Sequence, residues 1–171
     1  MIIKGKKINL IPFKKRDIIN KQYISWLRNK KLLQFSNQRF EKNSLKDLKK
    51  FYISLKKRND FFYKIFTKND QFIGTIICRI EKKHNTGNLG ILIGNQKFKS
   101  KGFGLDAWTT ALNFLIKKSK IRKIYAGTLT CNKPMLKIFI NSKMIFEARF
   151  KKHEKVNNKY YDTVFYATYK K

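Results

Sequence analysis

Residues 99–104, Lys-Ser-Lys-Gly-Phe-Gly, combine the residue types that hold a phosphate group. They follow the apolar stretch 89–94 and precede a segment with the apolar spacing of a helix. Glycines at a helix start let the backbone approach a ligand closely and direct several N–H groups at one point. The helix dipole makes that point favourable for an anion. The spacing therefore predicts a pyrophosphate cradle with lysines on both sides.

Two widespread phosphate motifs fit these residues poorly. A P-loop requires Lys and then Ser or Thr directly after its last glycine, and that order is missing here. The dinucleotide fingerprint G-x-G-x-x-A is present as Gly102, Gly104 and Ala107. However, it should directly follow a strand and have a ribose-binding acid about 20 residues on. After Asp106 the next acid is Glu147. A plain turn before a core helix is the alternative without a ligand.

Composition indicates a folded and strongly basic protein. The chain has 171 residues, which favours one domain over residues 1–171, and 41 Lys and Arg against 10 Asp and Glu give a formal charge of +31. Such a field attracts nucleic acid, anionic membranes and anionic small molecules. The lysines are spread along the whole chain, so composition bias of the genome explains them as well as selection for anionic ligands does.

The lack of targeting signals and the surroundings of the two cysteines favour a cytoplasmic location. The sequence has no apolar run of about 18 residues for a membrane span, and its first residues lack the apolar region of a signal peptide. Cys78 and Cys131, the two cysteines, lie in apolar strand-like surroundings, where free buried thiols are expected.

Apolar periodicity and turn residues predict eleven elements in the order β, α, α, β, β, β, α, β, α, β, β. Ser44 and Asp47 have the capping-box form before the second helix, and Pro134 suits the first turn of the last one. The expected strands are residues 8–13, 61–67, 72–80, 89–94, 123–130, 144–150 and 160–169. The expected helices follow Asp17, Ser44, Gly104 and Pro134.

The chain resembles the GNAT superfamily of N-acetyltransferases. Residues 99–104 are similar to its coenzyme A loop, Q/R-x-x-G-x-G/A, with Lys99 where Gln or Arg is usual. Asn132 matches the Asn that meets the pantetheine arm. Residues 144–147 resemble a further segment of the superfamily, with Met144 in place of glycine. Residues 26–29, 38–40 and 44–45 and the pair Tyr161-Asp162 are similar to the RimJ/RimL-like branch, which acetylates ribosomal-protein N-termini and includes small-amine and sugar-amine transferases.

This resemblance implies the fold, the cofactor and a set of site residues. The implied fold is a mixed α/β (α+β) GNAT fold, with a mostly antiparallel mixed sheet of about seven strands flanked by about four helices. Acetyl-CoA is the implied co-substrate, without a metal. The implied coenzyme contacts are Leu92, Ile93, Gly94, Lys99, Ser100, Lys101, Gly102, Phe103, Gly104, Asn132 and Phe139. The implied acceptor contacts are Arg39, Phe40 and His84.

The usual catalytic acid and base of the family are missing. The central-strand acid is replaced by Asn88 or Leu89, and the Tyr that protonates the thiolate falls at Phe139. The resemblance still implies that backbone N–H groups of Ile93 and Gly94 hold the thioester oxygen.

Among the remaining groups, His84 is our candidate base, because its ordinary pKa is near neutral. The alternative is that His84 is a solvated turn residue. Glu81 is a second candidate base, and Cys131 could donate a proton but is better explained as a packed thiol. His153 lies in a charged run that favours a surface position.

These observations lead to an acyltransferase that moves acetyl from acetyl-CoA to a primary amine. A small amine or a nucleotide-linked amino sugar is favoured slightly over a protein N-terminus, since an anionic acceptor suits the positive field. An inactive basic binding module of the same fold, in contact with nucleic acid, is the alternative of another class. We expect no membrane partner, only non-specific nucleic-acid binding, and a monomer or homodimer.

Overall fold

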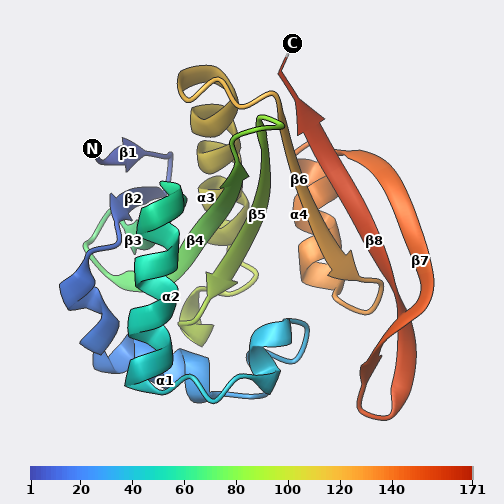
Figure 1. Ribbon diagram of the computed structural model, residues 1–171, viewed down its shortest axis with the longest axis horizontal. Helices are drawn as coiled ribbons and strands as arrows, with labels where there is room; N and C mark the ends of the chain where they lie inside the picture. The colour runs from blue at the N-terminus through green and yellow to red at the C-terminus, as the bar shows by residue number, and fades with distance from the viewer. Residues whose placement is uncertain (171) are drawn as a thin grey trace.

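The computed structural model describes residues 1–170 and contains one eight-stranded sheet with helices on both faces (Figure 1). The strands are β1 (Ile3–Lys4), β2 (Ile8–Pro12), β3 (Phe61–Thr67), β4 (Phe72–Glu81), β5 (Thr86–Ile93), β6 (Lys123–Leu129), β7 (Ile145–Val156) and β8 (Lys159–Tyr169). The helices are α1 (Lys21–Arg28), α2 (Leu45–Arg58), α3 (Phe103–Asn113) and α4 (Lys133–Asn141). Short helical turns are η1 (Lys15–Ile19), η2 (Asn37–Phe40), η3 (Gln96–Phe98) and the π-helical η4 (Phe114–Lys118).

The sheet has the order β1-β2-β3-β4-β5-β6-β8-β7. All neighbouring strands are antiparallel except β5 and β6, which are parallel and pair through only three residues, from Thr86 with Lys123 to Asn88 with Tyr125. Beyond that point β5 keeps its pairing with β4, and β6 keeps its pairing with β8. The sheet therefore opens between the carboxyl halves of β5 and β6.

Two apolar clusters lie on the two faces of the sheet. The larger one packs α3 and α4 against the sheet around Trp108 and Phe139, both fully buried. The smaller one packs α1 and α2 against the other face through Phe13, Trp26 and Leu48. Figure 1 shows α1 and α2 on the near side of the sheet and α3 and α4 behind it. The two faces of the β5–β6 opening therefore lie against different helix pairs.

Local sequence signals account for several helix ends. Ser44 and Asp47 form the expected capping box at the start of α2, and Asn59 closes that helix in the left-handed region with φ 58°. Pro134 lies in the first turn of α4. The expected fold class is confirmed, with one strand more than anticipated.

The additional strand is β1, whose two residues are too few to produce a pattern. It pairs with β2, from Ile3 with Leu10 to Lys4 with Asn9. The carboxylate of Asp106 in α3 fixes the connection between the two strands by accepting the backbone N–H groups of Lys6, Lys7 and Ile8 at 3.2, 2.7 and 3.1 Å. Two other boundaries differ from expectation: β5 begins at Thr86 rather than residue 89, and β7 extends to Val156 rather than ending at residue 150.

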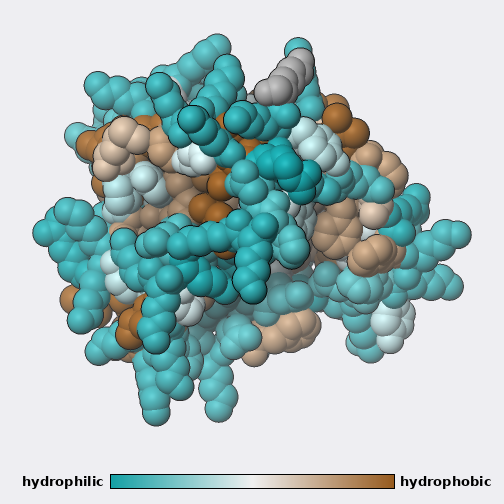
Figure 2. Space-filling model, turned by 45° about the horizontal axis from the view of Figure 1, so that its top comes forward, coloured by the Kyte–Doolittle hydropathy of each residue, from teal (hydrophilic) through white to brown (hydrophobic). Residues whose placement is uncertain are grey.

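The surface reflects the basic composition. Hydrophilic side chains cover most of the face in Figure 2, with apolar residues scattered between them. No helix among residues 1–170 is long and apolar enough to cross a membrane.

Candidate active site

The segment between β5 and α3 has the backbone geometry of an anion-binding loop. Ser100 and Gly102 adopt left-handed conformations, with φ 58° and 83°. Gly102 is the N-cap of α3, and no side chain caps the helix there. The N–H groups of the first turn are therefore left for a ligand, at the positive end of the helix dipole. Lys99, Ser100, Lys101 and Gly102 are exposed, while Phe103 packs edge-on against Phe98 with ring centroids 5.2 Å apart.

A third lysine joins this loop from the start of β2. The Nζ of Lys7 donates to the carbonyl oxygen of Lys101 at 3.2 Å and lies 5.8 Å from the ring centroid of Phe103. Partial burial lowers the pKa of Lys99 below its ordinary value. Sequence spacing did not indicate Lys7, because 94 residues separate it from Lys101.

The opening between β5 and β6 begins beyond Asn88 and reaches the start of this loop. The N–H of Gly94 donates to the carbonyl of Ile73 at 2.9 Å, toward β4. Because N–H directions alternate along a strand, the N–H of Ile93 points to the opposite side, into the opening. Of the two expected backbone donors, only Ile93 is therefore directed at the opening.

Gly94 has a packing role instead. A Cβ at this position would lie 1.9 Å from the indole of Trp26 in α1, so the close contact of α1 requires glycine. Leu92, another expected coenzyme contact, packs in the same cluster on the α1–α2 face.

Asn132 lies beside the opening, and Phe139 lies away from it. Parallel strands carry their carboxyl ends to the same edge, so Asn132, just after β6, lies at the edge of the glycine loop. Its Oδ1 caps α4 by accepting the N–H of Met135 at 3.4 Å, and its Nδ2 donates to Thr128 Oγ1 at 3.0 Å. Phe139 is fully buried between Trp108 and Tyr166, at centroid distances of 5.7 and 5.1 Å, as a core residue.

His84 is not near these groups. It is an exposed residue of the turn between β4 and β5, beyond the amino end of β5. The strand from Thr86 to Ile93 separates it from the loop by roughly 23 Å at the usual rise per residue. β5 and β6 are still paired at this end of β5, so His84 lies beyond the closed end of the two strands and not at the opening. Glu81 is exposed at the same end of the sheet.

A different polar cluster lies beside the opening, on the α1–α2 side. Arg39 in η2 contacts Glu154 in β7, with Nη2 and Oε2 3.5 Å apart and side-chain exposures of 12% and 24%. Thr163 in β8 donates through Oγ1 to Glu154 Oε1 at 3.5 Å and lies 3.1 Å from His153 Nδ1. We call Arg39, Glu154, Thr163 and His153 the acceptor cluster.

Strand register places the acceptor cluster level with the end of β5. Thr163 pairs with Leu129. Since Asn88 pairs with Tyr125, Leu129 is level with Leu92, four residues further along each strand.

Half-buried Cys131 follows β6 at this edge. Burial raises the pKa of the Cys131 thiol. The positive charges of Lys133 and Arg39 act to lower this pKa, and the negative charge of Glu154 acts to raise it. Arg39 and Glu154 are therefore both close enough to affect the thiol.

A wide bulge in β7 directs His153 and Glu154 into the cluster. Phe150 pairs with Thr163 and Glu154 with Tyr161, so residues 151–153 oppose Asp162 alone. The carboxylate of Asp162 fills the bulge by accepting the N–H of Lys152 at 2.7 Å and the Nε of Arg149 at 2.6 Å. These bonds lower the pKa of Asp162. His153 is exposed, as its charged run predicted, and the bulge brings its Nδ1 to Thr163.

Asn43 fixes the segment that carries Arg39. It is 3% exposed, and its Nδ2 donates to the carbonyls of Leu27, Gln38 and Glu41 at 2.9, 3.3 and 3.2 Å. Gln38 donates in turn to its Oδ1. The buried amide therefore ties η2 to the end of α1. Phe40, which is 72% exposed, lies beside Arg39, with 4.3 Å between the guanidinium carbon and the ring centroid.

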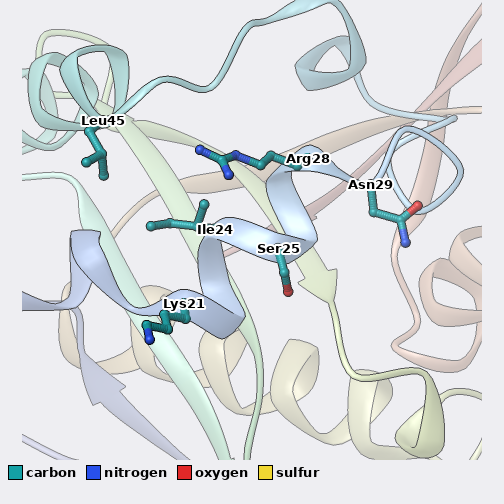
Figure 3. Close-up of a pocket in the computed structure, with 6 residues that line it drawn as sticks. All are labelled: Lys21, Ile24, Ser25, Arg28, Asn29 and Leu45. Atoms are coloured by element: carbon teal, nitrogen blue, oxygen red, sulfur yellow. The ribbon is translucent and has the colours of Figure 1, made fainter.

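A hollow of about 480 Å³ on α1 is a separate feature (Figure 3). Lys21, Ile24, Ser25, Arg28, Asn29 and Leu45 line it. It includes no carboxylate, histidine or glycine loop, and it offers none of the chemistry present at the β5–β6 opening.

Comparisons with known proteins agree with this geometry. A solved GNAT-family acetyltransferase from Bacillus anthracis is 18% identical, with a TM-score of 0.81 and 99% of each chain covered. A RimL ribosomal L7/L12 α-N-protein acetyltransferase in complex with coenzyme A is 19% identical, with a TM-score of 0.84 and coverage of 99% and 98%. Spermidine N-acetyltransferase from Vibrio cholerae, with coenzyme A and spermine, is 16% identical, with a TM-score of 0.84 and 97% of each chain covered.

These structural likenesses establish the fold. No curated protein matches the sequence significantly. The family model described as an acetyltransferase (GNAT) domain matches residues 7–144, which include the glycine loop, the β5–β6 opening and Arg39. The chain therefore belongs to the GNAT acetyltransferase family.

Proposed function

We propose that this protein is an N-acetyltransferase that transfers acetyl from acetyl-CoA to a primary amine. The observation that carries the proposal is the arrangement of three features along β5 and β6: the uncapped glycine loop, the opening toward which the Ile93 N–H points, and the acceptor cluster level with the end of β5. The arrangement places an anion-binding end and an end that carries a carboxylate on the same opening. The acceptor we favour is a small amine or a nucleotide-linked amino sugar, with a protein N-terminus as the alternative.

The residues present fit the coenzyme. The first-turn N–H groups of α3 and the lysines at 7, 99 and 101 would hold the pyrophosphate. The Ile93 N–H would contact the thioester oxygen, and Asn132 would contact the pantetheine arm through its remaining amide hydrogen. Bound acetyl-CoA supplies an activated acetyl carbon, to which the amine nitrogen bonds as the carbon–sulfur bond breaks.

Glu154 is our candidate general base in place of His84. The amine must lose a proton to attack, and the Glu154 carboxylate would accept it directly or through water. Thr163 then links Glu154 to His153, whose ring is exposed to solvent. The thiolate would take its proton from solvent or from Cys131, since Phe139 has no hydroxyl group and lies in the core.

The branch and the setting are part of the same proposal. The anchoring of the β7 bulge by Asp162 supports assignment to the RimJ/RimL-like branch, in which the chain would act in the cytoplasm as a monomer or homodimer. Nucleic-acid binding would be non-specific and lost at physiological salt.

Calorimetry with acetyl-CoA, together with coenzyme A release in the presence of a panel of primary amines, tests the proposal. We expect micromolar to millimolar binding and amine-dependent release. Binding without turnover on any amine would favour the inactive binding module, and absence of acetyl-CoA binding would refute the proposal.

A further inference from the structure

The guanidinium of Arg39 has an unpaired donor inside the protein. Its Nη2 contacts Glu154 and donates to the carbonyl oxygen of Lys155 at 3.3 Å. Its Nη1 is buried and has no hydrogen-bond partner. A buried charged donor without a partner is unfavourable and uncommon, since most buried polar groups are paired. This nitrogen therefore lacks a hydrogen-bond acceptor, and it lies where the amine substrate is proposed to bind.

The acids of this region do not meet that requirement. Glu154 contacts Nη2 rather than Nη1. Asp162 is occupied by Arg149 and by the N–H of Lys152. Lys155, whose carbonyl oxygen accepts from Arg39, carries a further positive charge, and the charge of Lys133 acts on the same Cys131 thiol as that of Arg39. The local balance around Arg39 is thus cationic, as it is for the chain as a whole.

We infer that the amine acceptor carries its own negatively charged group, a carboxylate or a phosphate, and that Arg39 binds it. This inference rests on the proposed function. Glu154 attracts the amine end of such a molecule, while Nη1 of Arg39 binds the anionic end. A guanidinium pairs with carboxylate or phosphate oxygens through short charge-assisted hydrogen bonds. Arg39 and Glu154 together are complementary to a molecule that carries both charges.

Phe40 lies against the same guanidinium. Its ring is 72% exposed, and the ring centroid is 4.3 Å from the guanidinium carbon of Arg39. An acceptor that binds Nη1 must share this space with the ring, so shortening Phe40 should improve binding of an anionic acceptor rather than weaken it.

The same features disfavour the other acceptor classes. A polyamine has no anionic group for Arg39, and it is repelled by a chain of net charge +31. A protein N-terminus offers Arg39 only the neutral carbonyl of its first peptide bond, which is a weaker partner than an anion.

Matched acceptor pairs test the inference. Phenylalanine is compared with phenylalaninamide for a carboxylate, and glucosamine 6-phosphate with glucosamine for a phosphate. We expect kcat/KM to be at least about tenfold higher for the charged member of one pair, which also identifies the anion, since one charge-assisted hydrogen bond is worth that factor. The preference should disappear in Arg39→Gln and persist in Arg122→Gln, an exposed charge change at the amino end of β6. Phe40→Ala should raise kcat/KM for the charged member only.

The ratio of kcat/KM for the charged amine to that for the neutral amine is compared between the wild type and Arg39→Gln. The difference in amine basicity within a pair cancels in this comparison, because both proteins are given the same two amines. Equal use of charged and neutral amines by the wild type, compared at equal concentrations of unprotonated amine, would overturn the inference and leave the proposed function intact. A preference that persists in Arg39→Gln would also overturn it. If no amine is acetylated although acetyl-CoA binds, the inference fails together with the proposed function.

Discussion

The coenzyme end and the acceptor end of this site are built in different ways. At the coenzyme end, a contiguous segment from Ile93 to Gly104 presents backbone N–H groups, so its chemistry depends on conformation more than on side chains. At the acceptor end, Arg39 and Glu154 lie 115 residues apart in sequence and meet only through the tertiary fold. A site built from backbone groups tolerates changes of side chain and is visible as a short motif in the sequence. A cluster of side chains from distant segments can determine specificity but produces no such motif.

The largest effect on acetyl-CoA affinity should come from the conformation of the coenzyme loop. Gly102→Val places a β-branched residue at φ 83°, which costs about 1–2 kcal/mol or forces the loop to move. Losing one or two charge-assisted hydrogen bonds to the pyrophosphate weakens acetyl-CoA binding on the order of 100-fold. Gly104→Ala is the matched control, because its added methyl would make ordinary contacts of 3.4 and 3.5 Å with Ile138 and Ile93. Calorimetry that gives wild-type affinity for a folded Gly102→Val protein would remove the loop from the site.

The acceptor end should respond through turnover rather than coenzyme affinity. Glu154→Gln keeps the shape and removes the base, so kcat should fall about 10²–10⁴-fold while acetyl-CoA affinity stays unchanged. His84→Ala, at the far end of β5, should remain within about twofold of wild type by the same assay, since it touches neither end of the site. Loss of turnover in His84→Ala with an active Glu154→Gln would reverse this assignment.

Asn132 tests the boundary between the two ends. Asn132→Ser keeps a side chain able to cap α4 and removes the amide, so the KM for acetyl-CoA should rise about fivefold, as for one hydrogen bond of ~1 kcal/mol. The KM of the amine should change less. A larger rise in the amine KM would move Asn132 to the acceptor end.

The smallest effect concerns the bulge that builds the acceptor end. The pKa of Asp162 is lowered by the N–H of Lys152 and by Arg149, so its contribution to stability is present above the unfolded pKa, near 3.9, and is lost as pH falls through the lower folded value. The wild-type melting temperature should therefore fall more steeply below about pH 4 than that of Asp162→Asn. If the melting temperatures of the two proteins change with pH in the same way between pH 2 and 6, the carboxylate does not anchor the bulge.

Sequence reasoning succeeded where the determinants are local. The glycine loop, the capping box of α2 and the element order depend on spacing within a few residues, and all are present as expected. The short β1 was missed because its two residues are too few to produce a pattern, and the connection that follows it is fixed by a carboxylate about 100 residues away. Phe139 was expected at the coenzyme because the resemblance places it where the family has its Tyr, but in α4 this position packs into the core.

The acceptor end was beyond the reach of sequence patterns for a physical reason. Glu154 and His153 lie within a run of charged residues, and only the bulge opposite Asp162 brings them to Thr163. The pair Tyr161-Asp162 was the available signal, and its structural role became clear only from the register of β7 and β8. Asn43 left no signal, since asparagine in a polar segment usually marks a solvated turn.

The three bonds from residues 6–8 to Asp106 have a consequence for the dynamics of the chain. They attach the amino-terminal segment to the first turns of the helix that starts at the glycine loop, so the two should open as one cooperative unit. Amide hydrogen exchange at Lys6, Lys7 and Ile8 should then slow when a ligand occupies the loop, although no ligand atom touches those amides. A fluorophore on the exposed amino terminus would report occupancy of the loop from outside the site.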